Sequence, residues 1–346
     1  MDLPTLLTWC NTCNINYAHA TAALKRTLTR NINQFLSQPI VLLDVISRYG
    51  AAIGGEVALA FVRRHQPVQP RTLEIFVGAS LHGAFCAELL SDNRVIPDVV
   101  GTAVAASRYP YILERDVLKT VQINLRGGQS IYIRQSSTLS PLSPIARSIC
   151  TAMVNFVTPH SFGCAYPALT LDDKSLVSDI RQNSMSDFDV RLMQTLAEQH
   201  IDSASDPASW PQYRTWSPTP AVPDTTKACW RSHFICPEQG RFFGDHGSLV
   251  GFVDPLGMPA ATLQERGAPP FGTAVVWRLS PTYRCPLSCE THDSTLPVGQ
   301  TSTAVILIRD PFAPRRRGRN TARSVRYNTL LPTSSVNATR RRSSSI

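Results

Sequence analysis

The residues with the clearest capacity for chemistry are a glycine pair and one acid that follows it. Gly54 and Gly55 come directly before a helical pattern over residues 56–64. The free amide groups at the N-terminus of such a helix can hold the phosphate groups of a cofactor. Glu74 lies on the next predicted strand, residues 72–77, where a carboxylate could hold a divalent cation. Gly54 and Gly55 are thus a candidate phosphate site and Glu74 a candidate catalytic acid. The alternatives are a tight connection between strand and helix at the glycines and a solvated strand residue at Glu74.

The order of these elements resembles the nucleotidyltransferase superfamily. A helix over residues 41–48 precedes a short strand, the glycine turn, a second helix and a strand with an acid. The resemblance implies that the glycine pair opens a helix beside a triphosphate. It also implies two acids, one residue apart, on the next strand and a third acid on a later strand. Metal ions held by these acids bridge the attacking and the leaving oxygen.

The chain departs from that pattern at the acids. Thr72 occupies the first acid position and only Glu74 matches, while Tyr132 and Arg134 stand on the later strand where a carboxylate belongs. One carboxylate cannot hold two divalent cations, so we expect a non-catalytic binding or scaffolding protein. The alternative is an active metal-dependent nucleotidyltransferase that uses another acid, such as Asp116.

A wider resemblance covers about residues 40–310. Its motifs are similar to a family of uncharacterised proteins of mushroom-forming fungi, in which the first half often resembles a degraded nucleotidyltransferase domain. That family implies no established activity. The motifs are residues 136–138, residues 140–147, residues 151–157, and Cys236-Pro237-Glu238-Gln239-Gly240-Arg241-Phe242-Phe243-Gly244-Asp245.

Apolar periodicity predicts the elements that position these residues. Residues 117–125 and 130–134 alternate apolar and polar side chains around Gly127 and Gly128, which predicts a β-hairpin. Helical patterns are predicted for residues 3–36, with weak amphipathicity, and for residues 41–48, 56–64, 82–90 and 144–157. The fold class is therefore α+β, a mixed sheet with flanking helices.

We expect five segments along the chain. A cluster of prolines with Trp210 and Trp216 indicates a linker, and strands are predicted beyond it at residues 249–253, 273–279 and 303–308. The segments are an N-terminal helical segment (1–38), a nucleotidyltransferase-like domain (39–200), a Pro/Trp-rich linker (201–228), a β-rich cysteine-containing region (229–308) and a disordered arginine-rich tail (309–346).

Four cysteines of the β-rich region could bind a structural zinc ion. Cys229 and Cys236 form one pair and Cys285 and Cys289 the other, and four thiolates from two turns give the tetrahedral arrangement that zinc prefers. The spacing of six residues in the first pair is wider than usual. The alternative is that all four are ordinary buried thiols. No other cofactor is expected.

The net charge of +9 belongs to the tail. Residues 309–346 hold ten arginines, no lysine and one acid, whereas the remaining residues hold 24 basic and 24 acidic side chains. Such a tail can bind nucleic acid without reading its sequence. The second alternative function is therefore a nucleic-acid-binding protein that acts through its tail, whereas the binding or scaffolding function implies an unknown protein partner. The arginines in its two clusters are Arg315, Arg316, Arg317, Arg319, Arg340, Arg341 and Arg342.

The chain carries no pattern of a secretory leader or of a membrane span. Asp2 and Pro4 stand where a basic leader would begin, and no apolar run approaches the roughly 18 residues of a membrane helix. Nine cysteines without a leader are typical of a reducing compartment. We therefore expect a protein of the cytoplasm or the nucleus with no membrane partner.

Overall fold

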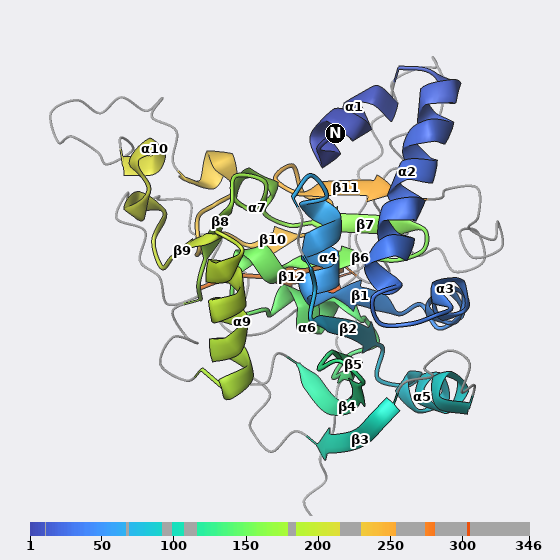
Figure 1. The fold of residues 1–346 in the computed structure, drawn as a ribbon. Helices are drawn as coiled ribbons and strands as arrows, with labels where there is room; N and C mark the ends of the chain where they lie inside the picture. The colour runs from blue at the N-terminus through green and yellow to red at the C-terminus, as the bar shows by residue number, and fades with distance from the viewer. Residues whose placement is uncertain are drawn as a thin grey trace, which may run out of the picture. The chain divides into compact units, whose positions relative to one another are not determined.

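The described residues form a mixed α+β arrangement. The computed structural model of the chain describes residues 1–10, 12–66, 69–91, 99–106, 116–178, 185–214, 230–253, 274–280 and 303–304. Within these ranges an eight-stranded mixed sheet is flanked by helices (Figure 1). The predicted α+β class with a mixed sheet and flanking helices is confirmed.

The helices and strands follow one another along the chain in a mixed order. The helices are α1 (Leu3–Cys10), α2 (Asn14–Ile32), α3 (Pro39–Arg48), α4 (Gly55–Val62), α5 (His82–Ser91), α6 (Leu142–Ala146), α7 (Pro167–Thr170), α9 (Asp187–Glu198), α10 (Pro211–Arg214) and the 3-10 turns η1 (Thr151–Met153), η2 (Pro207–Ser209) and η3 (Trp230–His233). The strands are β1 (Ala52–Gly54), β2 (Thr72–Val77), β3 (Val99–Ala106), β4 (Val117–Leu125), β5 (Ser130–Ser136), β6 (Asn155–Val157), β7 (Ser161–Cys164), β8 (Lys174–Leu176), β9 (Asp202–Ala204), β10 (Arg241–Phe242), β11 (Leu249–Phe252), β12 (Ala274–Trp277) and β13 (Thr303–Ala304).

The large sheet has the strand order β11-β7-β6-β1-β2-β5-β4-β3. β2 and β5 run parallel, and the other neighbouring strands of this sheet are antiparallel. The predicted hairpin is confirmed as β4 and β5, and it turns at Gly127 and Gly128, whose φ angles are +104° and +82°. These left-handed angles explain the glycine pair in that turn.

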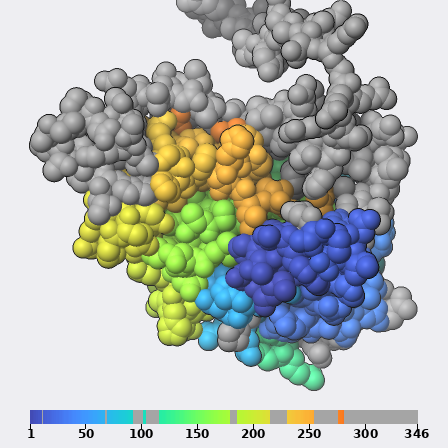
Figure 2. Space-filling view, turned by 90° about the horizontal axis from the view of Figure 1, so that it is seen from above, coloured from blue at the N-terminus to red at the C-terminus, as the bar shows by residue number. Residues whose placement is uncertain are grey.

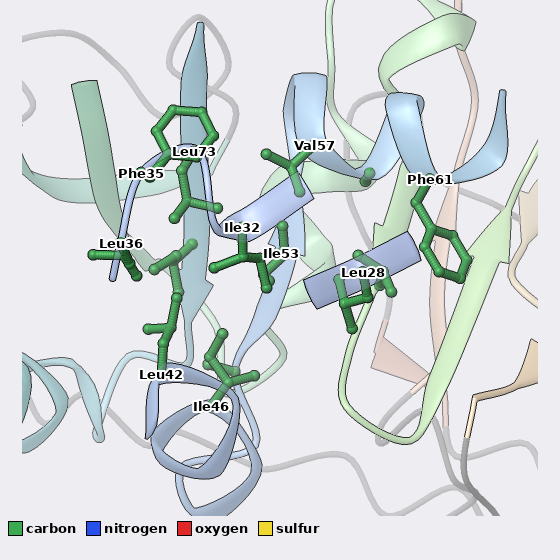
Figure 3. Close-up of a cluster of buried hydrophobic side chains, with 14 of the residues drawn as sticks. Leu28, Ile32, Phe35, Leu36, Leu42, Ile46, Ile53, Val57, Phe61 and Leu73 are labelled. Carbon is green, nitrogen blue, oxygen red and sulfur yellow. The ribbon is translucent and has the colours of Figure 1, made fainter. Parts of the chain in front are cut away.

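One face of the sheet is covered by the N-terminal helices. Leu73, Ile75 and Val77 of β2 project to this face and pack in one core with side chains from α1 to α5. Figure 3 shows Leu28 and Ile32 from this part of the chain near Ile53 of β1. Figure 2 shows the blue atoms of the N-terminal helices gathered beside the green atoms of the middle of the chain.

The opposite face of the sheet carries a second core and a polar region. Phe76 of β2 packs there with aromatic side chains from later in the chain, among them Phe156, Tyr166 and Trp277. Because side chains alternate along a strand, Glu74 leaves β2 on this same face. The candidate acid is therefore directed away from the helical core.

Arg241 lies beside the second core with its side chain 0% exposed, which is unusual for a charged residue. Its guanidinium group donates to both carboxylate oxygens of Asp245, at 2.6 and 2.9 Å, and to the carbonyl of Ala165 at 2.6 Å. It also lies 4.7 Å from the ring centre of Tyr166. A buried charge needs such partners. The motif at residues 236–245 therefore supplies both members of this buried ion pair, Arg241 and Asp245.

The predicted helix over residues 144–157 is wrong. The segment forms α6, η1 and then the strand β6, which lies between β1 and β7 in the sheet. Ala146, Ile149, Met153 and Phe156, the predicted buried side, are all buried, but so are the residues between them from Ile149 to Phe156. Uniform burial removes the periodicity that separates a helix from a buried strand.

Most of the other predicted elements are confirmed. The helical segment at residues 3–36 forms α1 and α2, and α2 buries Leu24 and Leu28 in spite of its weak amphipathicity.

In the predicted linker, the described part contains β9, η2 and α10, and Trp210 is buried with its Nε1 donating to Asp202. Trp216 lies outside the described residues. No helix that the structure describes is long and apolar enough to span a bilayer.

Candidate functional site

The glycine turn between β1 and α4 is filled by a side chain of the protein itself. Gly55 has a φ of +61°, and a Cβ atom built on it would lie 2.3 Å from Oε1 of Glu74. A Cβ atom on Gly54 would lie 2.7 Å from the ring of Phe76. Both glycines are therefore required by close packing. The group that approaches the start of α4 is the carboxylate of Glu74.

That carboxylate forms an ion pair with the arginine that stands on the neighbouring strand. In the parallel register Glu74 lies opposite Tyr132, and Phe76 lies opposite Arg134. Nε of Arg134 lies 2.7 Å from Oε2 of Glu74, and the two side chains are 14% and 2% exposed. A pair with so little contact with water is screened far less than a surface pair. The charge of the candidate acid is thus balanced inside the protein.

Two aromatic rings hold the guanidinium group of Arg134 in place. Its Cζ lies 5.2 Å from the ring centre of Tyr132 and 4.9 Å from that of Phe188, which is within the range of cation–π attraction. Phe188 stands in the first turn of α9, where Ser186 and Asp189 form a reciprocal capping box. The cap fixes where α9 begins, and this places Phe188 over the arginine.

A second carboxylate, Glu56, lies near Glu74 but has its own partners. Oε2 of Glu56 accepts hydrogen bonds from the backbone N–H groups of Arg71, at 2.5 Å, and Thr72, at 3.3 Å. The side chain is buried, and burial together with the charge of Glu74 raises the pKa of Glu56. Glu56 therefore holds the start of β2 onto α4.

Replacing Glu56 with glutamine is expected to change how stability depends on pH. Because the pKa of Glu56 is higher in the folded protein than in the unfolded chain, ionisation of Glu56 lowers the free energy of unfolding. This loss begins near the unfolded pKa, about 4.5, and is complete once the pH has risen through the higher folded pKa. E56Q removes this loss, at about 1.4 kcal/mol for each unit of pKa difference. Urea unfolding at pH 4 and at pH 7.5 should show E56Q gaining on wild type at the higher pH. A difference that stays constant would contradict the assignment.

Asp116, the alternative acid, is committed elsewhere. Its carboxylate lies 2.7 Å from Nε of Arg147 and accepts a hydrogen bond from the hydroxyl of Ser143 at 2.8 Å. The backbone carbonyl of Asp116 accepts a hydrogen bond from the N–H of Ser137. Ser137 comes five residues after Tyr132, and Tyr132 is the residue of β5 that stands opposite Glu74. At about 3.3 Å per residue this separation is roughly 16 Å. Each of the two carboxylates has an arginine of its own as partner, Arg147 for Asp116 and Arg134 for Glu74.

The predicted zinc ligands cannot be placed as a group. Cys229, Cys285 and Cys289 lie outside the described residues, and Cys236 is buried in the second core. Across the ranges that the structure describes, no three or more His, Cys, Asp or Glu side chains are arranged to hold a metal ion. The arginine clusters of the tail also lie outside the described residues. The zinc and tail expectations stay predictions.

A histidine and a cysteine on α5 make a pair that could suggest nucleophilic chemistry. Sγ of Cys86 lies 3.6 Å from Nε2 of His82, one helical turn away. Burial lowers the pKa of His82 and raises the pKa of Cys86. Both shifts favour the neutral forms, whereas a reactive cysteine needs a thiolate beside a charged imidazole. The pair therefore belongs to the packing of α5.

Three residues of this site had no role in the sequence prediction. Arg134 was singled out only because it stands where the resemblance requires an acid. Glu56 and Phe188 were given no function. A signal for the first was available, because Glu74 and Arg134 lie on predicted strands and carry opposite charges. The contact itself depends on the parallel register of β2 and β5, which periodicity does not give.

Comparisons of the chain with protein families, with curated proteins and with solved structures found no match. Its chemistry is therefore inferred from the arrangement of its own side chains.

Proposed function

We propose that the chain is a non-catalytic binding or scaffolding protein built on a nucleotidyltransferase-like core. The observation that carries this proposal is the ion pair between Glu74 and Arg134, at 2.7 Å and almost entirely buried. In place of a carboxylate that attracts a divalent cation, the sheet presents a carboxylate already neutralised by a guanidinium group.

The position of the pair argues against metal-bound triphosphate at the glycine turn. A cation at Glu74 would have to compete with Arg134 at a distance where like charges repel strongly. The space over Gly55 is also filled by the carboxylate of Glu74. A Cβ atom built on Gly55 would lie 2.3 Å from Oε1 of Glu74, which is too close for two atoms that are not bonded. Thr72, the other acid position, supplies its N–H to Glu56.

Polar, uncharged side chains of β4 and β5 are among the described residues that stand partly exposed on this sheet face. Gln122 donates to Asn124 at 2.8 Å, and the hydroxyl of Ser130 donates to the same amide oxygen at 3.1 Å. These side chains and Tyr132 are partly exposed. They offer hydrogen-bonding groups without the charge that phosphate transfer requires, which supports binding rather than catalysis.

An assay with labelled nucleotides tests the proposal. The full chain is incubated with labelled nucleoside triphosphates, magnesium or manganese, and hydroxyl acceptors that include nucleotides, RNA and peptides. We expect incorporation no higher than that of the E74Q variant, which keeps the shape of the acid and loses its charge. Turnover by the wild type that disappears in E74Q would overturn the proposal.

A further inference from the structure

The surface beside α2 contains a hollow lined by positive charge. Its volume is ≈ 620 Å³, and the described residues that line it include Lys25, Arg26 and Arg30 of α2 and Arg64, which follows the end of α4. The others are small or polar: Ala23, Thr27, Thr29 and Asn33. None of these described lining residues is acidic or aromatic. α2 and α4 pack against each other, as Figure 1 also shows.

The arginines of this hollow lack the partners that other arginines of the fold have. Among the described residues, no carboxylate forms an ion pair with Arg26, Arg30 or Arg64, in contrast to Arg63 and Arg241. Within the described part of the chain, Nη1 of Arg64 is buried and has no hydrogen-bond partner. Burial and the charges of Arg30 and Arg26 lower the pKa of Arg64. The three charges repel one another, and no described carboxylate forms an ion pair with them.

The helix ends at this place compensate only part of the charge. Arg30 stands in the last turn of α2 and Arg64 just past the end of α4, where each helix contributes about half a negative charge. Three guanidinium groups against two such ends leave about two positive charges. A solvated basic face alone does not account for this, because Arg64 is half-buried and the groups converge on one hollow.

We propose that this hollow binds a compact anion that carries two or more phosphate groups. Arginine is suited to phosphate because its planar donors can form two parallel hydrogen bonds. The size of the hollow fits a small ligand, and the lack of an aromatic side chain among its described lining residues indicates that phosphate groups, not a stacked ring, are recognised. The site lies at the opposite end of α4 from Gly55, so it is separate from the glycine turn and independent of the proposed function.

Inorganic triphosphate is the probe for the test, with the full chain in isothermal titration calorimetry. We expect the double variant R30Q/R64Q to bind triphosphate at least tenfold more weakly than wild type, and the affinity of wild type to fall as salt is raised. The matched control is R71Q, since Arg71 is an exposed arginine whose partner, Glu198, is also exposed. R71Q should bind like wild type. In thermal unfolding, added triphosphate should raise the Tm of wild type more than it raises the Tm of R30Q/R64Q.

Each further arm of the experiment has a decisive outcome. Equal triphosphate binding by wild type and R30Q/R64Q would overturn the proposal, because binding would then come from other arginines. If sulfate bound to the hollow as tightly as triphosphate does, the requirement for several phosphate groups would be overturned. A short single-stranded RNA that loses binding in R30Q/R64Q while triphosphate does not bind would assign the hollow to a nucleic-acid backbone instead.

Discussion

Replacing Arg134 with methionine is expected to destabilise the protein by about 3 kcal/mol, near the lower end of the cost of leaving a buried charge without its partner. Glu74 is 2% exposed, and Arg134 is the partner of its carboxylate at 2.7 Å. Methionine keeps much of the length and apolar contact of the arginine side chain against Tyr132 and Phe188. The loss is therefore mainly electrostatic, and urea unfolding at neutral pH measures it.

The matched control for this variant is an ion pair on the surface. Arg71 and Glu198 lie 3.4 Å apart and are 70% and 60% exposed. Exposed pairs contribute about 0–1 kcal/mol, so R71M should change the free energy of unfolding by less than about 1 kcal/mol. If R134M and R71M destabilise the protein equally, the buried pair has no special weight and the assigned role of Arg134 is wrong.

Replacing Gly55 with alanine is expected to have the second large effect, about 3 kcal/mol. Part of the cost is the left-handed backbone at φ +61°, which a non-glycine residue occupies with about 1 kcal/mol of strain. The larger part is steric, because the new Cβ would lie 2.3 Å from Oε1 and 2.9 Å from Cδ of Glu74. The acid has to move, and its contact with Arg134 is disturbed. Overpacking of this kind costs about 1–3 kcal/mol.

Gly50 provides the control that separates the two contributions. Its φ is +57°, almost that of Gly55, but a Cβ atom built on it meets nothing within 4 Å. G50A should therefore show the backbone strain alone, about 1 kcal/mol. Urea unfolding of both variants measures the difference. Values for G55A and G50A that agree within about 0.5 kcal/mol would show that Glu74 does not occupy the space over the turn.

The sequence was sufficient for the elements around the site. Alternation predicted β4 and β5, and β2 was predicted as the strand that follows the glycine turn and its helix. The glycine pairs marked the turns at Gly54-Gly55 and Gly127-Gly128, where positive φ angles are present at three of the four residues. These features are local, because a turn that needs left-handed backbone favours glycine wherever it occurs. The helix at residues 144–157 was wrong because burial from every side removes the local signal.

The pairing inside the site could not be predicted from the sequence. Glu74 and Arg134 are 60 positions apart, and they meet only because β2 and β5 are parallel neighbours in a particular register. A shift of that register by one residue would turn Arg134 to the other face. In the same way, the contact of Phe188 with Arg134 depends on how α9 packs against the sheet. Tertiary packing, not local propensity, decides these contacts.

The coupling free energy between Glu74 and Arg134 is the most direct test of the central claim that the candidate acid is neutralised within the fold. Urea unfolding of wild type, E74Q, R134M and E74Q/R134M closes a double-mutant cycle. We expect a coupling of about 2 kcal/mol or more, with the double variant more stable than the sum of the single losses allows. A coupling below about 0.5 kcal/mol would mean that Glu74 does not depend on Arg134, and its carboxylate would be available for a metal ion.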